Sequence, residues 1–91
     1  MIRPEETEIR CQWKVDSGKV VATPQCDRID TLTKSYLHKV TSDPSGWDKL
    51  YRDPQDGRLW ELTYPLSHMH GGGPPLLKII SESDARQKYK F

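Results

Sequence analysis

The sequence contains little of several residue types that mark specialised proteins. Its 91 residues include two cysteines, one phenylalanine and three histidines, and 14 basic residues nearly balance 13 acidic ones. The net charge of +1 argues against capture of nucleic acid by the whole domain, because proteins that bind it this way concentrate basic residues. No stretch approaches the roughly 18 apolar residues of a membrane span, and the N-terminus lacks the apolar core of a signal peptide. We therefore expect a cytoplasmic protein whose partner is neither nucleic acid nor a membrane.

The cysteines give no sign of a disulfide framework or a zinc site. Cys11 and Cys26 are 15 positions apart and form no C-x-x-C pair. Both fall on apolar stripes, where a thiolate would be costly. We expect two reduced, buried thiols that act as small apolar side chains.

The length predicts one domain spanning residues 1–91. A chain of this size buries only about 60 to 65% of its unfolded surface, so its core needs most of its aromatic residues. The three tryptophans and four tyrosines are therefore candidates for the core first.

Two segments predict strands that form a first hairpin. Residues 8–15 alternate between apolar and polar, and residues 19–22 form a β-rich return after the turn at 16–18. The predicted apolar face consists of Ile9, Cys11, Trp13 and Val15.

A helical stripe follows the first hairpin and predicts one long helix that ends at Thr41. The helix begins either at Pro24, with Thr23 before it, or at the acidic residues from Asp27. Its apolar positions are Ile29, Leu32, Tyr36, Leu37 and Val40.

A second hairpin is predicted from Trp47 to Pro65, because Pro54 and Gly57 suit a tight turn between two aromatic-rich runs. The segment Leu76 to Ile80 is apolar on both faces, which is typical of a strand near the centre of a sheet. A short C-terminal helix follows. The expected fold is α+β: a small, mostly antiparallel sheet of about five strands, made of two hairpins and one strand, with the long helix on one face.

The segment between the last two strands invites a search for chemistry. His68 and His70 form an H-x-H pair, but their side chains would alternate in an extended chain, and no third or fourth zinc ligand is near. The glycines 71–73 precede two prolines, which remove the amide donors that a phosphate loop needs. Ser67 lacks the Gly-x-Ser-x-Gly pattern of a nucleophile elbow. We expect no metal and no cofactor.

Several blocks in combination resemble a known family. They are Tyr51-Arg52-Asp53-Pro54, Asp56-Gly57-Arg58, Trp60-Glu61-Leu62-Thr63-Tyr64-Pro65 and His70-Gly71-Gly72-Gly73-Pro74-Pro75, together with Trp47. With them, nearly the whole chain resembles the immunity protein 27 family of bacterial polymorphic toxin systems. The resemblance implies a cytoplasmic, non-enzymatic antidote that binds and neutralises the C-terminal toxic domain of a cognate secreted or contact-delivered toxin. A monomer in a 1:1 complex with that domain is expected.

Exposed charge near the long Gly-Pro segment suggests where the partner binds. We expect one face formed by the rim of the second hairpin, an outward-facing strand position and the following loop. An alternative is a small hydrolase or nucleic-acid-processing enzyme that uses His70 with Glu61 or Ser67. The expected partner-binding residues are Asp53, Asp56, Arg58, Glu61, His68, Met69 and His70.

Overall fold

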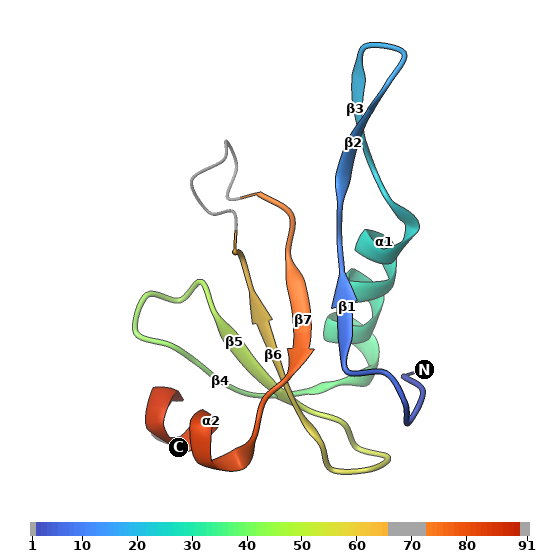
Figure 1. Ribbon diagram of the computed structural model, residues 1–91. Helices are drawn as coiled ribbons and strands as arrows, with labels where there is room; N and C mark the ends of the chain where they lie inside the picture. Colours follow the sequence, from blue (N-terminus) through green and yellow to red (C-terminus); the bar gives the residue numbers. More distant parts are fainter. Residues whose placement is uncertain (1, 66–72, 90–91) are drawn as a thin grey trace.

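The computed structural model describes residues 2–65 and 73–89 and is α+β, as predicted. A five-stranded antiparallel sheet has the order β1-β7-β6-β5-β4, and a separate two-stranded sheet pairs β2 with β3 (Figure 1). No helix in these two ranges is long and apolar enough to cross a membrane. The elements are β1 (Glu8–Arg10), β2 (Trp13–Asp16), β3 (Lys19–Ala22), α1 (Pro24–Thr31), the π-helix η1 (Leu32–Tyr36), β4 (His38–Ser42), β5 (Lys49–Arg52), β6 (Leu59–Thr63), β7 (Leu76–Ile79) and α2 (Glu82–Tyr89).

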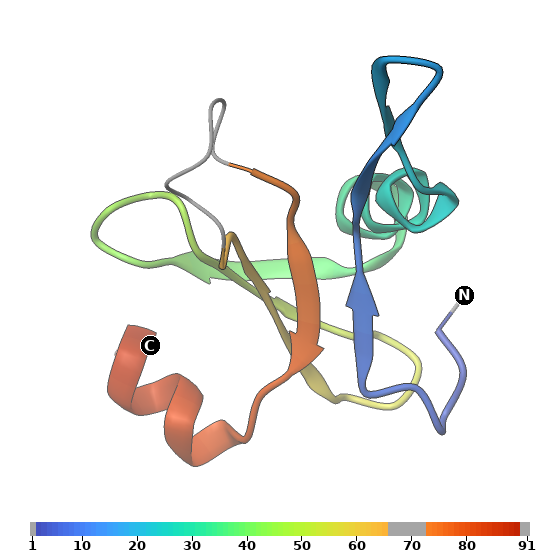
Figure 2. The same cartoon turned by 45° about the horizontal axis from the view of Figure 1, so that its top comes forward.

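The two faces of the large sheet carry two separate apolar clusters. On one face, Trp60 and Leu77 pack with Ile29 and Leu32 of α1 and η1. On the other face, Leu50 and Leu59 pack with Ala85 and Tyr89 of α2. The two helices therefore lie on opposite sides of the twisted sheet (Figure 2). Alternation along β5 and β6 supplies both clusters, which is why these two strands are apolar on both faces.

The predicted long helix ends earlier than its apolar stripe suggested. η1 ends at Tyr36, Leu37 has an extended backbone with ψ at 143°, and the next five residues form the edge strand β4. His38 therefore lies on a strand rather than on a helix. Leu37 and Val40 were consistent with a helical stripe, but Val40 and Thr41 are β-branched residues that favour strands. β4 pairs with β5 and supplies the fifth strand of the large sheet.

The second predicted hairpin and the central strand are confirmed. β5 pairs with β6 around the turn at residues 53–58, where Gly57 has a φ of 78° and the Asp53 amide donates to the Arg58 carbonyl at 2.9 Å. β7 lies between β1 and β6, in keeping with its apolar character on both faces.

The first predicted hairpin leaves the large sheet and projects from it (Figure 1). At Cys11 the backbone amide still donates to the Pro75 carbonyl, at 3.1 Å, and two residues later the chain begins to pair with its own return strand, β3. Gln12 and Thr23 close the base of the hairpin. The Thr23 amide donates to the Gln12 carbonyl at 2.9 Å, and the Gln12 amide donates to Thr23 Oγ1 at 3.2 Å.

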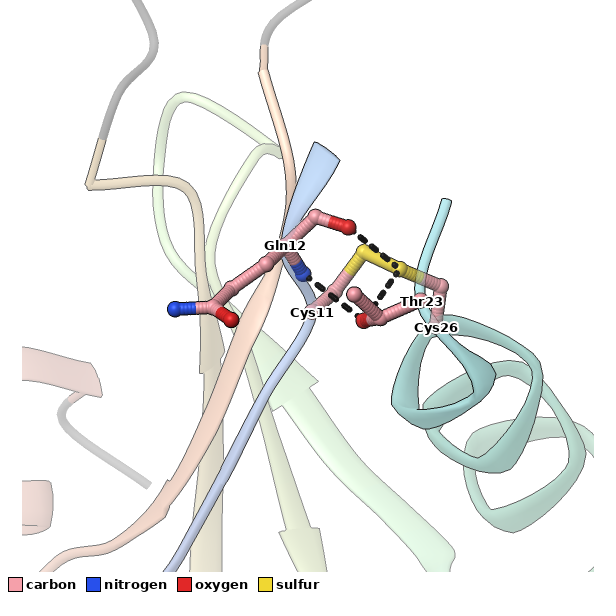
Figure 3. The surroundings of a disulfide bond; sticks show 4 residues. All are labelled: Cys11, Gln12, Thr23 and Cys26. Carbon is pink, nitrogen blue, oxygen red and sulfur yellow. Dashed lines mark hydrogen bonds between the residues drawn. A yellow bond between two sulfur atoms is a disulfide. The ribbon is translucent and has the colours of Figure 1, made fainter. Parts of the chain in front are cut away.

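The expectation of two reduced cysteines is wrong, because Cys11 and Cys26 form a disulfide (Figure 3). The bond joins the base of the hairpin to the first turn of α1. Spacing could not reveal it, since the contact arises only when α1 packs beside β1. It replaces two separate buried thiols with one covalent link across 15 residues.

Removing this bond should lower stability without unfolding the chain. A loop of 15 residues, the separation found here, corresponds to about 3 kcal/mol of stabilisation when it is cross-linked. We expect the Cys11→Ser/Cys26→Ser double variant to lose about that much in denaturant-induced unfolding, measured against the oxidised protein. Equal unfolding midpoints for the oxidised wild type and the double variant would contradict a stabilising role of the disulfide.

Candidate functional site

Asp53 lies inside the second hairpin rather than on its rim. The side chain is 1% exposed, and Oδ1 accepts hydrogen bonds from the Gln55 amide at 2.8 Å and from the Tyr36 hydroxyl at 2.7 Å. The bond to Asp53 raises the pKa of Tyr36 to about 12, because it stabilises the protonated hydroxyl. Asp53 therefore connects the turn to the end of η1, and the expectation that it is an exposed contact is wrong.

Arg58 uses its guanidinium to hold the N-terminal segment. It donates from Nε to Asp56 Oδ2 at 2.6 Å and to backbone carbonyls of residues 3, 4 and 6 at 2.8 to 3.2 Å. Its guanidinium carbon also lies 5.2 Å from the centre of the Trp60 ring. The pKa of Asp56 is lowered, first by the hydrogen bond from the Arg58 amide and also by the nearby guanidinium. Asp56 and Arg58 therefore both make contacts that stabilise the fold.

Glu61 is buried, so its predicted outward position is wrong. It is 4% exposed and faces α2, where Oε2 accepts hydrogen bonds from the Tyr89 hydroxyl at 2.8 Å and from Lys88 Nζ. Lys88 Nζ also donates to Asp48 at 2.8 Å. Burial alone would lower the pKa of Lys88, but the bonds to Asp48 and Glu61 outweigh burial and raise it. Burial, followed by the bond to Glu61, raises the pKa of Tyr89.

The described residues of the expected binding face are spread along β6 rather than gathered at one of its ends. The turn at residues 53–58 precedes β6, whereas Pro65 follows it, so these segments lie at opposite ends of the same strand (Figure 1). A strand of five residues is about 16 Å long. His68, Met69 and His70, as well as Ser67, lie outside the described residues. Within residues 2–65 and 73–89, no group of three or more His, Cys, Asp or Glu side chains could hold a metal ion.

An exposed tryptophan was missed by reasoning from the sequence. Trp47, in the loop between β4 and β5, is 55% exposed, and its ring meets that of Tyr64 edge to face with centroids 5.4 Å apart. Tryptophan was assigned to the core first because a small domain needs aromatic burial. The preceding Ser45-Gly46 pair, a turn signal, was the available hint that Trp47 belongs to a loop.

Hydrogen bonds hold the loop of Trp47 in place. Asp43 Oδ1 accepts from Ser45 Oγ at 2.8 Å, from the Gly46 amide at 3.0 Å and from the Asp48 amide at 3.3 Å. The pKa of Asp43 is lowered, first by the bond from Ser45. Gly46 has a φ of 80°, which a glycine adopts without strain. The tryptophan is thus presented by an ordered loop.

Comparison with known proteins identifies one family. The family model described as Immunity protein 27 matches residues 15–81, which is more than half of the chain. The matched range includes β3, both helical segments before β4, and strands β4 to β7. Searches of curated proteins and of solved structures each found no match.

Substitution of Glu61 tests whether its buried carboxylate stabilises the fold. Glu61→Gln removes the charge that Lys88 and Tyr89 bond to, so we expect it to lower the free energy of unfolding by about 2 kcal/mol. Glu8→Gln is the control, because Glu8 is exposed. In the described part of the chain its one recorded ion pair is with Arg10 at 3.4 Å, and an exposed pair of this kind contributes little. Unchanged stability in Glu61→Gln, measured by denaturant unfolding, would contradict the structural role.

Proposed function

The chain belongs to the immunity protein 27 family, and we propose that it neutralises a cognate bacterial toxin by binding that toxin's C-terminal toxic domain. The family match carries this proposal, because immunity implies a toxin as partner. The partner is a secreted or contact-delivered protein of a polymorphic toxin system. The complex is 1:1, and its formation in the cytoplasm protects the producing cell and its kin in competition between bacteria.

Binding rather than catalysis is the mode of action. The alternative enzyme uses His70 with Glu61 or Ser67. The Glu61 carboxylate already accepts bonds from Lys88 and Tyr89 on the α2 side of the sheet, whereas Ser67 and His70 lie outside the described residues. These contacts support an inhibitor that acts through its surface.

The first step of the test is to identify a polymorphic toxin gene next to this one, and the second is to co-express its C-terminal toxic domain with the protein. We expect the protein to restore growth of cells that produce the C-terminal toxic domain, and to bind the purified domain at a ratio of one to one in titration calorimetry. An unrelated immunity protein serves as the negative control. Growth arrest that persists at matched expression, together with no binding, would reject the proposed function. Activity of the isolated protein that His70→Ala abolishes would instead favour the enzyme.

The disulfide bears on the compartment in which neutralisation takes place. Disulfides are rare in the bacterial cytosol, where thiols are kept reduced, so the Cys11–Cys26 bond opposes a cytoplasmic site of action. Neutralisation there requires that the fold persists with two thiols. This is compatible with a loss of about 3 kcal/mol from a domain stability of about 5 to 15 kcal/mol.

Thiol trapping in intact cells tests the compartment directly. Cytoplasmic action predicts that both cysteines are alkylated when cells are quenched in acid and then treated with a thiol reagent under denaturing conditions. The same sample reduced before alkylation gives the reference for full labelling. A pair that is labelled only after reduction would move the site of action to an oxidising compartment.

A further inference from the structure

The exposed large apolar side chains gather at one end of the molecule. β1 and β6 end there while β5 and β7 begin there, as the pairings of Arg10 with Leu76 and of Lys49 with Leu62 show. From this end of the strands, the β2–β3 hairpin rises beside β1 at one edge of the sheet, and the β4–β5 loop that carries Trp47 extends at the opposite edge (Figure 1). Within the described ranges, the exposed large apolar residues are Trp13, Val15, Val20, Val21 and Trp47.

Three of these five side chains lie on the same face of the β2–β3 hairpin. In the hairpin, Trp13 pairs with Ala22 and Val15 pairs with Val20, so their side chains share one face, whereas Val21 lies on the other. Val15 and Val20 are 74% and 68% exposed. A two-stranded ribbon that leaves such a face uncovered is unusual for a protein that works alone.

Two hollows connect this face to Trp47. One, of about 310 Å³, is lined by Trp13, the disulfide and Tyr64. The other, of about 420 Å³, is lined by Tyr64 and Trp47. Tyr64 therefore lines both hollows, one of which is bordered by Trp13 and the other by Trp47. We call the resulting strip the aromatic surface; it consists of Trp13, Val15, Val20, Tyr64 and Trp47.

Acidic side chains line one hollow beside Trp13, whereas Arg10 and Lys14 line a second hollow that Trp13 also borders. Asp27 and Asp30 of α1 both line the first of these hollows. Asp30 is paired with Lys34 at 3.1 Å, whereas among the described residues the structure records no partner for Asp27. A cationic side chain on a partner would complement this position.

We infer that the toxic domain docks on the aromatic surface, with apolar side chains against Trp13, Tyr64 and Trp47 and a lysine or arginine beside Asp27. This inference rests on the proposed function and names its contact site. Tryptophan on an ordered loop is a typical anchor of a protein interface, because it offers a large area at little cost in conformational entropy. The hollows on either side of Tyr64 give the partner's side chains places to enter.

A second copy of the chain fits this surface less well. In a twofold dimer the same patch occurs on both sides, so the acidic rim of one copy would approach that of the other. A standard interface also involves about 20 to 30 residues on each side, more than the five residues of the aromatic surface and their acidic rim provide. A larger partner that extends onto neighbouring elements meets both requirements.

Binding of the purified C-terminal domain of the adjacent toxin, measured by calorimetry, tests the inference. We expect Trp47→Ala and Val15→Ser/Val20→Ser each to raise Kd roughly tenfold or more, because interface anchors dominate affinity. Asp27→Lys should also raise Kd, and this increase should become smaller in high salt. Melting temperature is measured for each variant, and Trp47→Ala decides alone if the hairpin variant does not fold.

Matched controls separate the aromatic surface from general effects of substitution. Val21→Ser makes the same change on the opposite face of the same hairpin, and Glu5→Lys makes the same charge reversal away from this end. Both should leave Kd within about twofold of wild type. Wild-type binding with no loss in Trp47→Ala or the hairpin variant would overturn the inference while leaving the proposed function intact. A wild-type protein that does not bind the domain would instead reject the proposed function, and the inference with it.

Discussion

The linkage between Cys11 and Cys26 is the constraint on which the rest of the arrangement depends. The chain leaves the large sheet at Cys11, and residues 13–16 then pair with residues 19–22 in a separate two-stranded sheet. Two-stranded hairpins have little stability of their own. The covalent link to α1, together with the hydrogen bonds between Gln12 and Thr23, fixes the base of the hairpin relative to the core. Together these contacts position Trp13 at the hollow that Tyr64 also lines.

Several charged residues that were expected at the surface make contacts within the fold, whereas several apolar residues that were expected in the core are exposed. Asp53, Arg58 and Glu61 bind their own chain: Asp53 orders a turn, Arg58 holds the N-terminal segment, and Glu61 ties β6 to α2. The ion pair with Lys88 and the hydrogen bond from Tyr89 offset the cost of burying the charge of Glu61. The free surface instead includes aromatic and aliphatic side chains, which desolvate readily when a partner covers them.

Local signals in the sequence were sufficient for part of the fold. Pro54 and Gly57 located the second hairpin, and the apolar run from Leu76 located the central strand. Local signals failed where the conformation or burial of a residue depends on contacts with a segment far away in the sequence. Val40 fits a helical stripe and a strand equally well, and pairing with β5 selects the strand. The burial of Glu61 depends on Lys88 and Tyr89, which are 27 and 28 residues away. The Cys11–Cys26 bond likewise depends on the packing of α1.

Hydrogen exchange of the complex with the toxic domain tests the central claim most directly, because it reports where the partner covers backbone amides without any substitution. The account predicts slower exchange on binding at residues 13–22 and 43–48, and unchanged exchange in the turn at residues 53–58. Protection confined to that turn, with exchange in the hairpin and the loop of Trp47 unaltered, would contradict it.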